Sequence, residues 1–135
     1  MSKVKAQEFK SRSKYVVIGM VSCYDNHPQL QEGYIDYLKL KFYDMDFATP
    51  IWPGITSDDA EKILDFAEEY KNKVDLIVVH CNAGISRSSG AAAALSLIYN
   101  GDDNWIFKDL RYMPNMRVYR KILEAADKRG LLSQW

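Results

Sequence analysis

The chain has 135 residues, of which 47% are hydrophobic and 27% are charged, values typical of one ordinary globular domain over residues 1–135. Its 18 basic and 18 acidic residues give a formal net charge of zero, which argues against a protein that binds nucleic acid through phosphate contacts. Two cysteines cannot form a disulfide framework, and no apolar run approaches the roughly 18 residues of a membrane span, so we expect free thiols and no membrane partner.

The first predicted elements are strands. A short strand is predicted around Val4, and YVVIGMV at 15–21 is almost continuously apolar, as expected for a parallel strand covered on both faces. This run is shorter than most signal-peptide cores, so we interpret it as a core strand and the following Cys23 as a buried thiol. YLKLKF at 37–42 alternates polar and apolar residues, which indicates a strand nearer the sheet edge.

A helix and a strand precede the most informative segment. In TSDDAEKILDFAEEY, Thr56 followed by Asp59 resembles a capping box, and apolar residues recur at helical spacing. DLIVVH at 75–80 is a second almost continuously apolar strand. The alanine-rich run at 87–99 is then predicted to be a buried helix, closed by Gly101 as its C-cap.

Two more helices complete the chain. Asp102 or Asp103 caps a short one that runs through Leu110, and Pro114 starts the last one, which Gly130 ends. Strands separated by helices indicate an α/β fold. We predict a three-layer sandwich in which helices flank a central, mostly parallel four-stranded sheet.

The segment HCNAGISRSSG, residues 80–90, joins a buried strand to a buried helix. Open α/β sheets bind ligands at such a loop, and the free N–H groups of the first helical turn favour an anion. Gly84 permits a backbone conformation that turns neighbouring N–H groups inward. Arg87 offers a planar fork to two oxygens of a phosphate, and this positive surrounding lowers the pKa of Cys81 and favours its thiolate.

These residue types support nucleophilic displacement at phosphorus. A Cys81 thiolate can attack a phosphoester and form a covalent phosphocysteine, and Ser88 can donate a hydrogen bond to the thiolate as it leaves. His80 fits a structural role, with its ring bonded to loop carbonyls, better than a role as acid or base. The alternative is an inert, buried cysteine in a tight turn. Arg87 argues against it, because a charged side chain at the end of the loop does not stabilise a hydrophobic core.

HCNAGISRSSG resembles the His-Cys-x5-Arg-Ser motif of cysteine-based protein tyrosine phosphatases, particularly the dual-specificity group. The resemblance extends over residues 14–128, where YLKLKFYD looks like the family's strand that ends in the general-acid aspartate. PNMRVYRKI resembles the family's helix start, whose asparagine, here Asn115, supports the phosphate loop. The resemblance implies a phosphotyrosine-phosphatase-like fold and a mechanism without metal or cofactor. It also implies a phosphate-binding loop made of Asn82, Ala83, Gly84, Ile85, Ser86 and Arg87.

The general acid has two candidates, because the leaving oxygen needs a proton from a carboxylic acid that faces the loop. Asp58 and Asp59 are explained as capping residues of their helix, and Gly54 in WPG stands where larger tyrosine phosphatases have an aspartate. Asp44 ends the strand-like stretch at the position that matches the family's acid. Asp46, two residues later, is the alternative.

We therefore predict a cytoplasmic, monomeric phosphomonoester hydrolase whose partner is a phosphorylated protein or peptide carrying phosphotyrosine, with phosphoserine and phosphothreonine as further candidates. Residues 45–56 form either a lid over the site or a rigid connector. A non-catalytic pseudophosphatase is one alternative. Phosphatases of lipids or RNA 5′ ends are another, although no lysine occurs between Asn82 and Ser86 and the chain has no basic surplus.

Overall fold

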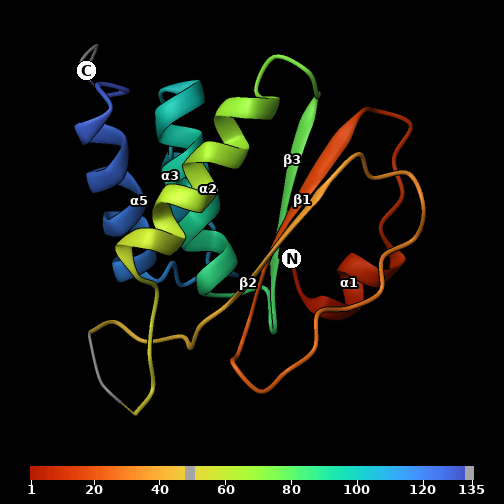
Figure 1. Ribbon diagram of the computed structural model, residues 1–135, viewed down its shortest axis with the longest axis horizontal. Helices are drawn as coiled ribbons and strands as arrows, with labels where there is room; N and C mark the ends of the chain where they lie inside the picture. The colour runs from red at the N-terminus through yellow and green to blue at the C-terminus, as the bar shows by residue number, and fades with distance from the viewer. Residues whose placement is uncertain (48–50, 133–135) are drawn as a thin grey trace.

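The computed structural model describes residues 1–47 and 51–132 and shows an α/β fold (Figure 1). In chain order the elements are α1 (Lys3–Glu8), β1 (Tyr15–Val21), β2 (Tyr37–Lys41), α2 (Ser57–Tyr70), β3 (Leu76–Cys81), α3 (Arg87–Asn100), α4 (Asn104–Phe107) and α5 (Met116–Lys128). None of the helices in the described part of the chain is long and apolar enough to cross a membrane.

The sheet is parallel, with the strand order β2-β1-β3. β1 lies in the middle, and all seven of its residues are buried, which explains its continuous apolar sequence. In its register Ile18 lies between Leu38 of β2 and Val79 of β3. Because the strands are parallel, the loops that follow them meet at one edge of the sheet.

Helices cover the two faces of the sheet unequally. Figure 1 shows α2, α3 and α5 together on one face, whereas α1 and the loop between β1 and β2 lie on the other. The main core lies under the three helices and includes Ile18, Leu64 and Ile122, all fully buried. A smaller cluster on the opposite face contains Tyr15, Val17 and Val78, with Phe9 packed against it.

The prediction of a strand around Val4 is wrong, and the described residues form three strands rather than four. Residues Lys3–Glu8 form α1, whose N-cap Ser2 accepts a hydrogen bond from the Lys5 N–H. Polar and apolar residues alternate over Lys3–Gln7 as in an edge strand, but KVKAQE consists mainly of good helix formers and Ser2 caps it as a helix. Met1 lies at the outer edge of β3, where it donates to the Val79 carbonyl at 2.7 Å and accepts from the Cys81 N–H at 3.0 Å.

The helix ends agree with most of the predicted signals. Thr56 and Asp59 form the predicted capping box at the start of α2, and Gly101 is the C-cap of α3. α4 ends at Phe107, earlier than predicted. α5 begins at Met116 because Asn115 is its N-cap, so Pro114 lies outside the helix.

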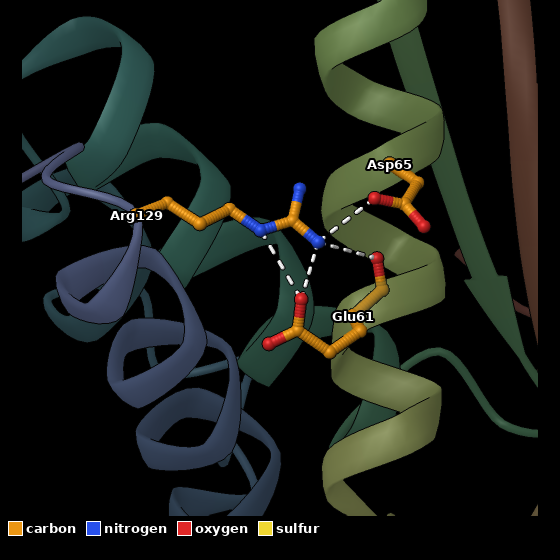
Figure 2. A network of polar contacts seen from close by, with 3 residues as sticks. All are labelled: Glu61, Asp65 and Arg129. Carbon is orange, nitrogen blue, oxygen red and sulfur yellow. Dashed lines mark hydrogen bonds and ion pairs between the residues drawn. The ribbon is translucent and has the colours of Figure 1, made fainter.

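A polar cluster joins the far end of α5 to α2 (Figure 2). The Arg129 guanidinium donates to the Glu61 carboxylate and, at 2.8 Å, to Asp65. It also contacts the Glu61 carbonyl at 3.3 Å. Arg129 follows the C-terminus of α5, so this cluster holds the end of the helix opposite to the one that begins at Asn115. Such exposed pairs contribute little to stability, about 0–1 kcal/mol.

Candidate active site

The site is built around the loop of residues 82–86, which leads from the carboxyl end of β3 to the N-terminus of α3. Gly84 has a φ of +77°, a backbone conformation that other residues rarely adopt. A Cβ at this position would also lie 2.5 Å from the Ser2 nitrogen and 2.6 Å from the Met1 carbonyl carbon. Two independent constraints therefore require glycine at the turn of the loop.

Cys81 lies at the base of this loop and is 2% exposed. Its Sγ is 3.2 Å from the Ser88 Oγ, with which it forms a hydrogen bond, and it accepts another from the Gly84 N–H at 3.2 Å. Burial raises the pKa of the thiol, but the hydrogen bonds from Ser88 and Gly84 and the positive charge of Arg87 outweigh burial, so the pKa of Cys81 lies below its ordinary value. These contacts favour a thiolate.

Donors for an anion surround this sulfur. Within the described residues, no hydrogen bond joins the N–H groups of Ala83, Ile85, Ser86 or Arg87 to a protein acceptor. The first turn of α3 also begins at Arg87, so the positive end of the helix dipole faces the same place. The loop therefore presents the free N–H groups that an oxyanion needs.

Arg87 is 6% exposed. Its guanidinium donates three hydrogen bonds to other groups of the protein. Nη1 donates to the Phe42 carbonyl at 2.7 Å and to Ser22 Oγ at 3.1 Å, and Nη2 donates to Asn82 Oδ1 at 2.8 Å. A guanidinium carries five N–H donors, so two remain. Two donors on a fixed plane match two oxygens of a phosphate.

The contacts of Asn82 include two residues that the sequence analysis missed. Its Oδ1 accepts from the Ser22 N–H at 3.0 Å, and its Nδ2 donates to Asp25 at 2.8 Å. Ser22 follows β1, the neighbour of β3, and loops after adjacent parallel strands meet at one edge of the sheet. This rule about parallel strands could have predicted Ser22 and Asp25 as neighbours of Asn82. Cys23, in the same turn, is partly exposed rather than buried as predicted.

Asp44 is held beside the loop by two hydrogen bonds. Its Oδ1 accepts from Ser86 Oγ at 2.8 Å and from Asn115 Nδ2 at 2.6 Å. Both end on the same oxygen, so Oδ2 is the atom that can carry a proton. Asp46 lines the same cleft, and no hydrogen bond or ion pair connects its carboxylate to the described residues. The geometry therefore gives Asp44 the more defined position of the two carboxylates.

Asn115 connects three parts of the site. Its Oδ1 accepts from the Val118 N–H at 3.0 Å, which caps α5, while its Nδ2 contacts Asp44. Its own N–H donates to the Ser86 carbonyl at 3.0 Å. α3 can approach this residue closely because of Gly90, where a Cβ would lie 2.6 Å from the Asn115 carbonyl oxygen. One side chain thus couples the helix start to the candidate acid, and its backbone contacts the loop.

The segment expected to be a lid or a connector is described only in part, because residues 48–50 lie outside the described residues. On either side of this gap the chain is anchored. Asn115 Nδ2 contacts the Met45 carbonyl at 3.3 Å, and Arg117 donates to the Ile55 carbonyl at 3.1 Å. The Tyr43 N–H also donates to the Pro53 carbonyl at 2.8 Å. These contacts favour a connector for the described part of the segment.

His80 is fully buried on the face of the sheet opposite to the three large helices. Its Nε2 lies 2.7 Å from the Tyr37 hydroxyl, a partner that the sequence analysis did not include. A Cβ at Gly19 would lie 2.4 Å from the same nitrogen, so the ring occupies the space left by that glycine. Burial lowers the pKa of His80 to about 4, with the nearby His27 acting in the same direction. The ring is therefore neutral near pH 7.

These residues open into a cleft of about 880 Å³. Cys81, Arg87, Asp44 and Asp46 line it, together with side chains from residues 107–120. The arrangement can bind a tetrahedral oxyanion, attack it with sulfur and donate a proton to the group that departs.

A parallel α/β sheet with a cysteine at the base of an anion-binding loop is the architecture of phosphatase-like proteins. The chain belongs to the protein-tyrosine phosphatase family, whose sequence model matches residues 3–123. No curated protein matches the chain by sequence.

Solved structures show the same fold. Human DUSP28 has 17% sequence identity and a TM-score of 0.67, over 100% of this chain and 93% of its own. The human tyrosine phosphatase-like serine/threonine/tyrosine-interacting protein has 18% identity and a TM-score of 0.60, over 87% of this chain and 78% of its own. PTPMT1, solved in complex with PI(5)P, has 19% identity and a TM-score of 0.58, over 86% and 81%. The fold is thus that of dual-specificity-like phosphatases, and family and fold together support phosphatase activity.

Proposed function

We propose that the protein hydrolyses phosphomonoesters of phosphotyrosine in peptides or proteins, with phosphoserine and phosphothreonine as further substrates, through a phosphocysteine intermediate. The observation that carries this proposal is the surrounding of Cys81. A buried sulfur with a lowered pKa lies below free N–H groups and beside Arg87, which has two donors left. A merely structural cysteine would not need these groups.

The reaction has two steps in this proposal. The Cys81 thiolate attacks phosphorus, so that a P–S bond forms while the P–O bond to the substrate breaks. Asp44 gives its proton to the departing oxygen. Water then attacks the phosphocysteine, with the Asp44 carboxylate accepting a proton from that water, and the thiolate leaves with a hydrogen bond from Ser88. Arg87 and the loop N–H groups bind the phosphoryl oxygens throughout.

The proposal is tested by hydrolysis of an aryl phosphate and of a phosphotyrosine peptide by the wild type and by Cys81→Ser. We expect turnover by the wild type, no turnover by the variant, and retained binding of the peptide by the variant. EDTA should leave the wild-type rate unchanged, because Arg87 and the N–H groups supply the positive charge. Appreciable turnover by Cys81→Ser would contradict the covalent route.

A non-catalytic phosphate-binding module is the second candidate, and one neighbour in the fold is described as phosphatase-like and interacting. In this chain a cysteine, an arginine and a carboxylic acid all line one cleft, which favours an enzyme. Tight binding of a phosphopeptide without any turnover by the wild type would support the module instead.

A further inference from the structure

The cleft continues beyond the phosphate-binding loop, where several of the side chains that line it are apolar. Four large side chains line it there, from the loop itself, from α4, from the connection between α4 and α5, and from the start of α5: Ile85, Phe107, Met113 and Met116. We call these four residues the apolar shelf. Each is at least 36% exposed, and Met113 is 75% exposed. Apolar side chains gathered beside a polar site are typical of ligand-binding clefts.

The apolar shelf is held at a fixed distance from the loop by backbone hydrogen bonds. The Met113 N–H donates to the Ile85 carbonyl at 3.0 Å, and the Asn115 N–H donates to the Ser86 carbonyl at 3.0 Å. The Phe107 ring packs edge-on against Tyr119 of α5, with 5.3 Å between ring centroids. A bound phosphate therefore has preformed apolar neighbours, which lowers the entropic cost of ordering them.

We propose that the apolar shelf binds an apolar side chain next to the phosphorylated residue of a peptide substrate, and that the protein selects such peptides. This inference rests on the proposed function, because it assumes that phosphate occupies the loop at Cys81. The shelf is continuous with the loop through Ile85, which belongs to both. A peptide whose phosphate lies in the loop must therefore pass over the shelf or directly beside it.

The charges around the cleft favour a peptide over a lipid surface. Asp44 and Asp46 line the same cleft as the apolar shelf, and both are exposed. Arg120 is the only Lys or Arg besides Arg87 among the described residues that line the cleft. An anionic membrane attracts clusters of basic side chains and is repelled by carboxylates, so this rim is poorly suited to it. A neutral apolar side chain of a peptide meets no such repulsion.

The test compares two phosphotyrosine peptides that differ only beside the phosphotyrosine, with leucine on either side in one and glutamine in the other. For the wild type we expect kcat/KM to be about tenfold higher for the leucine peptide. Met113→Ser and Met116→Ser should each reduce this ratio to about twofold or less. The ratio is measured on one protein sample, so it does not depend on how much of a variant is folded.

Leu110→Ser is the matched control. Leu110 is 97% exposed and belongs to the same connection between α4 and α5, but it does not line the cleft. Its substitution should leave the tenfold ratio unchanged. Equal rates for both peptides with the wild type, or the same loss of selectivity in Leu110→Ser, would overturn the inference.

The result is separable from the proposed function by a small aryl phosphate, which carries no neighbouring side chain for the apolar shelf to select. If the wild type hydrolyses this compound, Cys81→Ser does not, and neither peptide is preferred, then the inference about the apolar shelf is wrong. The proposed phosphatase activity is then still supported. Without Cys81-dependent hydrolysis, the proposed function itself fails. Hydrolysis of a phosphoinositide in phosphatidylcholine vesicles tests whether the apolar shelf binds lipid instead of a peptide. If Met113→Ser lowers vesicle hydrolysis and leaves the peptide ratio unchanged, the shelf binds lipid and the inference is wrong.

Discussion

Asp44 is proposed as the general acid, the group that protonates the leaving oxygen. Its two hydrogen bonds, from Ser86 and Asn115, leave Oδ2 to carry the proton of a general acid. Asp44→Asn cannot donate that proton, so it should slow esters of poorly acidic alcohols and phenols by about 10²–10⁴-fold. An aryl phosphate with a strongly acidic phenol should be affected far less. The measurement is the rate of hydrolysis of a series of phosphoesters whose leaving groups have increasing pKa values.

Asp46→Asn is the control for this assignment, since Asp46 lines the same cleft without a defined partner. We expect the dependence on the leaving group to remain as in the wild type. If Asp46→Asn steepens that dependence and Asp44→Asn does not, then Asp46 is the acid. Until then the role of Asp44 stays a prediction.

Arg87 combines binding of the substrate with support of the site. Lysine preserves its charge but cannot reach Phe42, Ser22 and Asn82 while also offering two donors to a phosphate. Arg87→Lys should therefore lower kcat/KM by about 100-fold or more and reduce the unfolding free energy by about 1–3 kcal/mol. Arg111→Lys, an exposed change beside Asp109, should alter neither quantity. Near-normal kinetics of Arg87→Lys would refute the bidentate role.

The sequence predicted residues of the site correctly where reactive residues lie close together in the chain. Cys81, Gly84 and Arg87 lie within one loop, so their spacing alone predicted a shared site. Ser22 and Asp25 were missed because they contact Asn82 from the loop after the neighbouring strand β1, about 60 residues away in the chain, and their own sequence has no unusual chemistry. The partner of a buried side chain depends on tertiary packing, which a local pattern does not contain.

Two N-caps allow a comparison at the level of helices. Thr56 caps α2 and Asn115 caps α5, and each side chain accepts a hydrogen bond from a backbone N–H in the first turn. Thr56→Ala and Asn115→Ala should each lower the unfolding free energy by about 0.5–2 kcal/mol. Only Asn115→Ala should also slow poor leaving groups, because Asn115 holds Asp44. Equal kinetics in the two variants would show that this contact does not serve the acid.

Elements with strong internal patterns were predicted well, and marginal ones were not. β1 and β3 are apolar runs, and α2 has both a periodic apolar face and a capping box, so little else could form. α1 has only six residues, and a helix this short depends on its neighbours rather than on its own sequence. The predicted fourth strand failed there for the same reason. A strand there would also need a partner strand, which no local pattern specifies.

The pH dependence of folding tests the whole molecule, because His80 is fully buried against one face of the sheet. Folded His80 stays neutral down to about pH 4, since burial lowers its pKa to about 4. In the unfolded chain it protonates around pH 6.5. Between these values the unfolded state binds more protons, so the unfolding free energy should fall as the pH is lowered from about 6.5 to about 4. Urea denaturation across this range measures it.

His27 contributes in the same direction, because burial also lowers its pKa. NMR titration of both rings separates the two contributions without any substitution. We expect the His80 resonances to stay unshifted down to about pH 4. A titration of His80 near pH 6.5 would contradict the description of its environment.

The surroundings of Cys81 lower the pKa of its thiol and so favour the thiolate that the proposed reaction needs. The most direct test is the alkylation rate of Cys81 as a function of pH, measured in a Cys23→Ser background that leaves a single thiol. We expect an apparent pKa well below the ordinary value of about 8.5, and protection of the thiol by vanadate, which occupies the loop as a phosphate does. An apparent pKa at or above about 8.5, without protection by vanadate, would contradict it.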